Sequence, residues 1–232
     1  MRNFGMRNNL QPDHLDGEAS MGSAGQSLGA LRAWPQARRF RAMPTTTSAR
    51  GLSWGHHRGA SVDGSPLVAE NNTIIGNTVL YGATDGYLFA SGRAGERFCV
   101  RNSGAKVVIE GCGSNGCEYM TGGVAVILGS IGQNFGAGMT GGMAYVYDPK
   151  GEALEYMNME TLVTVPVTVD HWEDQLKSLI LRHADETGST KAHKILQEWD
   201  SQKRNFIQVC PTEMLPHLKV PLSLEEAAMP AE

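Results

Sequence analysis

Residues 120–147 read MTGGVAVILGSIGQNFGAGMTGGMAYVY, and this stretch decides the fold. Met120-Thr121-Gly122-Gly123 returns 19 residues later as Met139-Thr140-Gly141-Gly142. Toward the N-terminus, Ser103-Gly104 and Asp85-Gly86 occupy the same phase at steps of 19 and 18 residues. A fixed period near this length indicates a solenoid, in which each coil buries its apolar face only by stacking on its neighbours.

A short apolar run follows each of these glycines, at 87–89, 105–109, 124–128 and 143–147. Each of the first three of these four runs ends at a second glycine corner. Glycine suits such corners because they need positive φ, or bring neighbouring coils so close that a Cβ would clash. The predicted structural corners are Gly86, Gly92, Gly95, Gly104, Gly111, Gly113, Gly123, Gly129, Gly132 and Gly142.

The pattern predicts a mainly β fold, a right-handed parallel β-helix that forms a single-stranded solenoid over residues 66–150. Its coils of about 19 residues fit neither the hexapeptide period of left-handed β-helices nor the Leu/Asn pattern of leucine-rich repeats. Residues 151–232 are expected to form a helical extension that packs on the β-helix. Asp170 and Glu173 are spaced as a capping box before a first helix, and Gly188-Ser189 precedes a second apolar stripe that includes Trp199.

The composition suits a globular protein, with 41% hydrophobic and 19% charged residues. A net charge of −4 does not favour a nucleic-acid or anionic-membrane partner. No apolar run approaches the roughly 18–20 residues that span a bilayer. Because the sequence also has no apolar signal segment, we expect a cytoplasmic location and four free thiols, at Cys99, Cys112, Cys117 and Cys210.

Several stretches resemble the C-terminal GXGXG domain of the glutamate synthase large (alpha) subunit. They include 76–84, 92–105, 110–123 and 134–142, and the resemblance extends over about residues 22–30 and 65–215. It implies a part of an enzyme that makes two glutamates from glutamine and 2-oxoglutarate in nitrogen assimilation, with NADPH or ferredoxin as reductant.

In that family the reactive groups lie in an amidotransferase domain and in a synthase domain that carries FMN and an iron–sulfur cluster. The resemblance therefore implies a structural domain with no catalytic, cofactor-binding or metal-binding residues of its own. It also implies the amidotransferase and synthase domains as partners, with the small subunit as a further one.

Between Leu31 and Val62 the resemblance fails. A plausible coding for the family's run Gly-Asp-Ala-Asn-Asp-Tyr-Val-Gly-Lys, read one base later, spells the residues found at 42–50. A second out-of-frame reading gives 54–57. We therefore hypothesise that residues 31–62 are partly translated out of frame, and that residues 1–65 form an irregular, partly damaged leading segment.

Other patterns have competing interpretations. Cys112-x4-Cys117 and His56-His57 invite a metal site, but neither supplies a full ligand set, so packing and an accidental pair are favoured. The spacing of Gly136, Gly138 and Gly141 matches a dinucleotide fingerprint, but a strand follows where a helix is required. Acidic side chains could serve a sugar-cleaving enzyme, and arginines could bind an anion. These are Asp85, Glu96, Glu110 and Glu118, and Arg93, Arg97 and Arg101.

Two alternatives to a structural domain of a glutamate synthase stay open from the sequence. One is a stand-alone β-helix subunit of a multi-subunit oxidoreductase, of the split glutamate synthase or formylmethanofuran dehydrogenase C type. The other is a carbohydrate-active β-helix enzyme, although such enzymes usually have many more coils.

Overall fold

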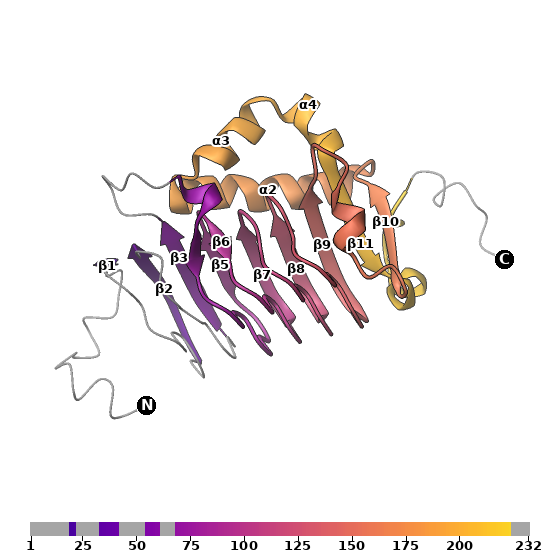
Figure 1. The fold of residues 1–232 in the computed structure, drawn as a ribbon, viewed down its shortest axis with the longest axis horizontal. Coiled ribbons are helices and arrows are strands. Elements are labelled where there is room, and N and C mark those ends of the chain that lie inside the picture. Colours follow the sequence, from indigo (N-terminus) through magenta and orange to yellow (C-terminus); the bar gives the residue numbers. More distant parts are fainter. Residues whose placement is uncertain (1–18, 22–32, 42–53, 61–67, 224–232) are drawn as a thin grey trace.

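The structure is a computed structural model that describes residues 19–21, 33–41, 54–60 and 68–223, the first three ranges as backbone strands. Parallel strands stand side by side in one sheet, two antiparallel strands close its C-terminal end, and helices cover one face (Figure 1). The predicted solenoid followed by C-terminal helices is confirmed. The strands of the sheet, in spatial order, are β1 (Ala19–Met21), β2 (Ala33–Arg41), β3 (Trp54–Ala60), β5 (Tyr87–Ala90), β7 (Ser103–Ile109), β8 (Thr121–Ile127), β9 (Gly141–Tyr147), β11 (Phe206–Pro211) and β10 (Leu162–Pro166).

The register of the parallel strands gives the length of each coil. Tyr87 pairs with Lys106, Lys106 with Val124, and Val124 with Met143. Successive coils are therefore 19, 18 and 19 residues long, which agrees with the predicted period of about 19 residues. A short second sheet joins β4 (Thr73–Ile75) to β6 (Arg93–Ala94) on another side of the first coils.

Both faces of the main sheet are buried from β5 to β9. Alternate side chains such as Val107 and Ile127 point into the solenoid, where they form one apolar cluster. Their neighbours Val108 and Val126 point outward and pack in a second cluster with the helices. Burial on both faces explains why these strands read as continuous apolar runs and not as an apolar–polar alternation.

Helix α2 (Asp170–Thr187) lies across the outer face of the parallel strands, and α3 (Thr190–Gln197) and α4 (Trp199–Gln202) return above it (Figure 1). Leu176 and Ile180 on α2 are completely buried against the sheet. Among the described residues, no helix has the length and apolar character that a transmembrane segment needs. Short 3₁₀ helices complete the fold: η2 (Ala69–Asn71), η3 (Ala153–Tyr156), η4 (Lys203–Asn205) and η5 (Thr212–His217).

The predicted capping box at the start of α2 is wrong. The N-cap is Val169, which makes no side-chain hydrogen bond to the helix, and Asp170 is already the first helical residue. The carboxylates of Asp170 and Glu173 therefore act in the first turn, where negative charge favours the helix N-terminus. The junction to the next helix follows the prediction, because Gly188 ends α2 at φ 68° and Ser189 caps α3.

Between residues 78 and 138, one side of each coil has a backbone that the glycine pattern did not predict. Three alternate residues per coil adopt the left-handed conformation, for example Arg97, Cys99 and Arg101 with φ between 55° and 59°. The amides of Arg97 and Arg101 donate to the next coil, at 2.8 Å to Ser114 O and 3.0 Å to Glu118 O. The amide of Cys99, between them, donates to the preceding coil, at 2.9 Å to Val79 O. Left-handed geometry costs an L-residue roughly 1–2 kcal/mol, which these bonds between coils offset. Across the described residues nine non-glycine positions have positive φ: Thr78, Leu80, Arg97, Cys99, Arg101, Asn115, Cys117, Tyr119 and Asn134.

The ten corner glycines fall into two geometric groups. Five have positive φ, namely Gly86, Gly92, Gly111, Gly123 and Gly142. The other five, Gly95, Gly104, Gly113, Gly129 and Gly132, have ordinary φ but face the backbone or side chain of the preceding coil. A Cβ on Gly104 would lie 2.0 Å from the carbonyl oxygen of Thr84, so only glycine allows the two coils to approach there.

Within the leading segment, β2 and β3 extend the parallel ladder from β5. Backbone hydrogen bonds to a neighbouring coil can form whatever side chains the strand carries. Apart from β1, β2 and β3, residues 1–65 lie outside the described residues. The proposed out-of-frame reading concerns the gene and stays a prediction, and the nucleotide sequence under residues 31–62 tests it.

Replacement of Gly104 with alanine tests the close approach of the coils. Because its Cβ would meet a backbone oxygen of the preceding coil, we expect a loss of about 3 kcal/mol in the free energy of unfolding, at the upper end of overpacking costs. Gly82→Ala is the control, because nothing lies within 4 Å of its Cβ and only its φ of 62° opposes the change. The control should lose about 1 kcal/mol in urea unfolding. Equal losses in the two variants would contradict the steric argument.

Candidate functional site

A buried carboxylate lies where the solenoid meets the helices. Glu110, at the corner after β7, is 2% exposed, and its Oε1 accepts hydrogen bonds from the hydroxyls of Ser91, at 3.2 Å, and Ser189. His183 on α2 places its Nε2 at 3.8 Å from the same oxygen. Ser91, Glu110, His183 and Ser189 are named here the carboxylate cluster. The cluster joins two neighbouring coils to α2 and to the start of α3.

Burial acts against the charge of both ionisable groups in the cluster. It opposes ionisation of Glu110, but the facing His183 imidazole and the Ser189 and Ser91 hydroxyls outweigh it and hold the pKa of Glu110 below its usual value. Burial also lowers the pKa of His183, with a smaller contribution from His193, while Glu110 opposes this shift. A charged carboxylate therefore faces a neutral imidazole at neutral pH.

The residue types of the carboxylate cluster are those of a Ser–His–acid triad, but the geometry is different. Nucleophilic catalysis needs the serine bonded to the histidine and the histidine oriented by the acid. Both serines donate to Glu110, and neither nitrogen of His183 has a hydrogen-bond partner among the described residues. The cluster is also buried, so no substrate reaches it. Its chemistry is that of a structural link.

The structure does not bring the other acidic candidates together. Glu118 pairs with Arg97 at 3.8 Å on the left-handed side of the coil, and Asp85 accepts from the amide of Gly86. Glu96 is exposed, with its amide bonded to Asn77. Because each of these groups has its own neighbours, none forms with Glu110 the facing carboxylate pair that glycoside hydrolysis requires.

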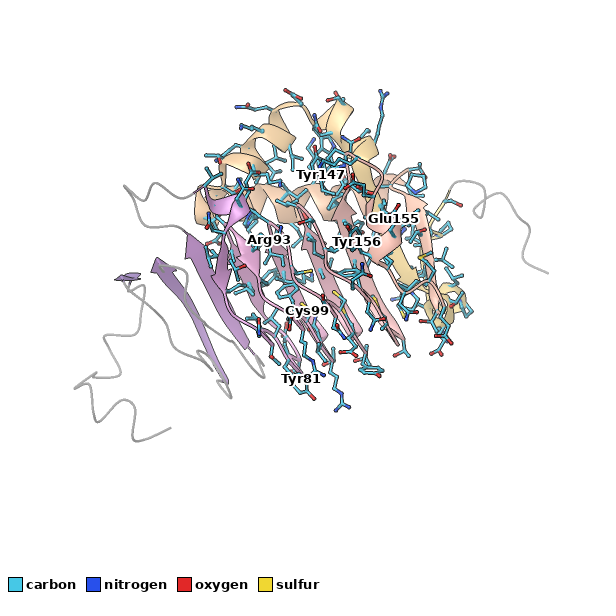
Figure 2. The ribbon with its side chains drawn as sticks, viewed as in Figure 1. Tyr81, Arg93, Cys99, Tyr147, Glu155 and Tyr156 are labelled. Carbon is cyan, nitrogen blue, oxygen red and sulfur yellow. The ribbon has the colours of Figure 1, made fainter. Side chains whose placement is uncertain are left out.

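The three arginines also have separate contacts. Arg93 donates to the hydroxyl of Ser130 two coils further along, and Arg101 lies over the ring of Tyr81 with 6.0 Å to the ring centroid. Figure 2 places Arg93 and Tyr81 on opposite sides of the coils, with Cys99 between them. The arginines therefore do not converge on one anion site.

The cysteines belong to the apolar interior. All four are free and buried, and Cys99, Cys112 and Cys117 lie in the cluster inside the solenoid. Burial raises the pKa of the Cys99 and Cys112 thiols, which keeps them protonated at neutral pH. Since the thiolate is the metal ligand, this environment favours packing over an iron–sulfur or zinc site. Within the described residues no group of three potential donors is arranged for a metal ion.

The remaining sequence candidates have ordinary structural positions. Gly136 and Gly138 adopt positive φ on the left-handed side of the coil, and β9 begins at Gly141 where a dinucleotide site needs a helix. His56 and His57 fall on β3, and their side chains are outside the described part of the chain.

A cavity of about 420 Å³ opens near the C-terminal end of the solenoid. It is named here the corner cavity, and its lining residues are 129–131, 147–150, 152–153, Tyr156 and Lys191. Figure 2 shows Tyr147 and Tyr156 in this region, with Glu155 beside Tyr156.

The polar groups that line the corner cavity are largely engaged with other parts of the chain. Lys191 pairs with Glu70 at 3.2 Å, and Tyr147 donates to the side chain of Gln202. Asp148 accepts from the amides of Glu152 and Ala153 at 3.0 and 2.8 Å. The cavity therefore suits an apolar group better than a polar metabolite.

The carboxylate cluster was missed at the level of sequence for a physical reason. Ser189 and Glu110 are 79 residues apart, and no local pattern signals their contact. The only available signal was Ser189 after Gly188. It predicts the start of a helix, but it does not predict that the Ser189 hydroxyl also donates a hydrogen bond to Glu110. Ser189 accepts from the amide of Ala192 at 3.0 Å while it donates to Glu110.

Comparison with known proteins identifies relatives over almost the entire chain. Residues 2–212 match the family described as "GXGXG motif". The glutamate synthase [NADPH] large chain of Azospirillum brasilense is 53% identical over 228 residues, which are 97% of this chain and 15% of that one. The ferredoxin-dependent glutamate synthase of Pyropia yezoensis is 48% identical over 82% of this chain and 12% of its own length. The glutamate synthase [NADPH] large chain of Bacillus subtilis is 40% identical over 82% of this chain and 13% of its own. The chain thus spans about a seventh of the length of these relatives.

We expect the stability of the fold to fall as the pH drops from 7 to 5, because of His183. Its pKa is lowered in the folded state, so below the ordinary value of 6.5 the unfolded chain binds a proton that the folded chain does not. The contribution of Glu110 is lost at lower pH, below its ordinary pKa of 4.5, because its folded pKa is lowered. In urea unfolding at several pH values, His183→Leu should flatten the pH 7 to 5 slope. An unchanged slope would show that another group is responsible.

Ser189→Ala tests the link between the helices and the solenoid. The substitution removes the cap of α3, which is worth about 1 kcal/mol, and a hydrogen bond to a charged group, which is worth about 1.5–3 kcal/mol. We expect a clear fall in the urea midpoint, whereas the exposed neighbour Thr190→Ala should change it little. In Glu110→Gln the effect of Ser189→Ala should be smaller, because the bond is no longer charge-assisted. Additive effects would contradict direct coupling.

Proposed function

The chain belongs to the GXGXG family, and from this membership we propose that it is the C-terminal region of a glutamate synthase large chain. The observation that carries the proposal is the match of 97% of this chain to 15% of the Azospirillum large chain at 53% identity. A segment that aligns almost completely within a much longer relative corresponds to one structural region of that relative.

The parent enzyme, in this proposal, forms two glutamates from glutamine and 2-oxoglutarate and serves nitrogen assimilation. The names of the relatives include both NADPH-dependent and ferredoxin-dependent glutamate synthases. Either reductant is therefore compatible with this region, to which the proposal assigns no electron-transfer group.

Within that enzyme the proposed role of the chain is a non-catalytic scaffold. Glu110 and Glu118 interact with neighbouring side chains of the fold, and burial holds the Cys99 and Cys112 thiols protonated. These cysteines do not fit the ligands of an iron–sulfur cluster, which are thiolates. The turn at Gly136 and Gly138 leads into a strand, so it does not fit the phosphate of FMN in the manner of a helix N-terminus. The cofactors of the reaction are assigned to the synthase domain.

The proposed partners are the amidotransferase and synthase domains of the large chain, with the small subunit as a further candidate. A rigid solenoid presents the same outer surface in every molecule, because each coil is hydrogen-bonded to the next. That rigidity suits a region whose task is to hold other domains at fixed distances.

A chimera tests the proposal. The corresponding region of the Azospirillum large chain is replaced with this chain, and glutamate formation from glutamine, 2-oxoglutarate and NADPH is measured with the small subunit present. We expect the chimera to be active, the large chain without this region to be inactive, and the isolated chain to form no glutamate. An inactive chimera, or activity in the isolated chain, would refute the proposed role.

A further inference from the structure

The chain leaves the last full coil of the solenoid through a segment that forms only part of another coil. Residues 153–160 run parallel to the coil at Phe135, where Met157 forms a β-bridge. Phe135 donates to Tyr156 O and accepts from Asn158 N, both at 2.9 Å. Since one side of this segment is bonded to the preceding coil, its other side faces the space in which a further coil would stack.

Apolar side chains are exposed on this segment. Leu154 is 47% exposed and Met159 is 44% exposed. The other large exposed apolar side chains of the described residues lie far apart in the chain: Val68 just before η2, Tyr119 between β7 and β8, and Leu181 on α2. Single exposed apolar side chains are normal, and a larger apolar patch is what marks an interaction site. Leu154 and Met159 therefore support such a site together with the cavity beside their segment.

The corner cavity lies at the start of the same segment, because Ala153 and Tyr156 belong to its lining. Lys191 and Asp148 in its wall are already engaged with Glu70 and with the amides of Glu152 and Ala153, so an apolar side chain from a partner leaves no polar group of the wall newly in need of a bond. Such an anchor in a pocket, with weaker contacts around it, is the usual energetic centre of a protein interface.

The charges around the segment are mostly negative. Glu152, Glu155 and Glu160 are exposed. The basic residues beside them are Lys150 and Lys191, and Lys191 is paired with Glu70. A partner segment that carries lysine or arginine beside its apolar anchor complements this arrangement.

We infer that residues 152–160 and the mouth of the corner cavity are a docking surface for another part of the same large chain. The inference rests on the proposed function. The occupant is a segment with an apolar anchor and basic flanks, and it comes from the large-chain sequence that this chain lacks. The relatives are long enough to supply it, because this chain accounts for only 15% of the Azospirillum large chain.

Thiol footprinting tests the docking surface when the labelling is read peptide by peptide, which separates the introduced cysteine from those in the rest of the chimera. Within this chain the background is low, because all four native cysteines are buried. Leu154→Cys and Met159→Cys are each placed in the isolated chain and in the chimera, and the rate of labelling by a maleimide is measured. Leu181→Cys is the matched control, since Leu181 is 46% exposed on α2. We expect labelling at 154 and 159 to be at least tenfold slower in the chimera than in the isolated chain, with little change at 181.

The charge of the occupant is tested by a second substitution. In the chimera, Glu155→Arg should raise the labelling rate at 154 at least threefold, because it repels a basic segment, and should leave position 181 unchanged. Equal labelling of 154 in an active chimera and in the isolated chain would overturn the docking surface and leave the proposed function intact. An inactive chimera would instead refute the proposed function, and the docking surface with it. Labelling of the isolated chain that slows with its own concentration would identify a second copy as the occupant and would also overturn the inference.

Discussion

The coils of this solenoid must stack at the spacing of a hydrogen-bonded sheet, about 4.8 Å, along the whole of each turn. At the start of the strands, where the register of the ladder shifts, this spacing removes the room for a side chain. A Cβ at Gly104, Gly122 or Gly141 would lie 2.0 to 2.2 Å from a carbonyl oxygen of the preceding coil. The repeated glycine is therefore a consequence of the stacking distance. The same distance requires the left-handed backbone on the other side of the coil, where alternate amides reach alternate neighbours.

The stacked strands in turn require the helices. Parallel strands with apolar side chains on both faces are stable only when both faces are covered, and the solenoid interior covers just one of them. Helix α2 covers the other, and the outward row that includes Val108 and Val126 packs against it. The carboxylate cluster adds a directional link to this apolar contact. A buried charge costs several kcal/mol unless it is bonded, so Glu110 favours the one helix position in which Ser189 reaches it.

The sequence predicted the features that repeat locally and missed those that depend on contacts distant in the chain. The 19-residue step, the strand positions and the corner glycines follow from a pattern visible within one coil and its neighbour. The left-handed conformation of Thr78 or Tyr119 could not be predicted, because neither residue type favours it and the hydrogen bonds that stabilise it come from adjacent coils. The cap of α2 was misplaced for a related reason. Asp170 and Glu173 have the spacing of a capping box, but the helix begins one residue earlier than that pattern requires.

The candidate surface of the molecule follows from how the solenoid ends. On the sheet side the chain itself covers the last parallel strand, since β11 pairs antiparallel with β9 and β10 pairs antiparallel with β11. On the opposite side, residues 153–160 cover the last coil only in part. They form hydrogen bonds with the preceding coil, but Leu154 and Met159 stay exposed. A solenoid buries the apolar face of each coil with the next one, and a terminal coil needs either polar side chains or a partner. This end has both an acidic rim and apolar side chains, a combination that fits contact with a basic and apolar segment better than contact with water.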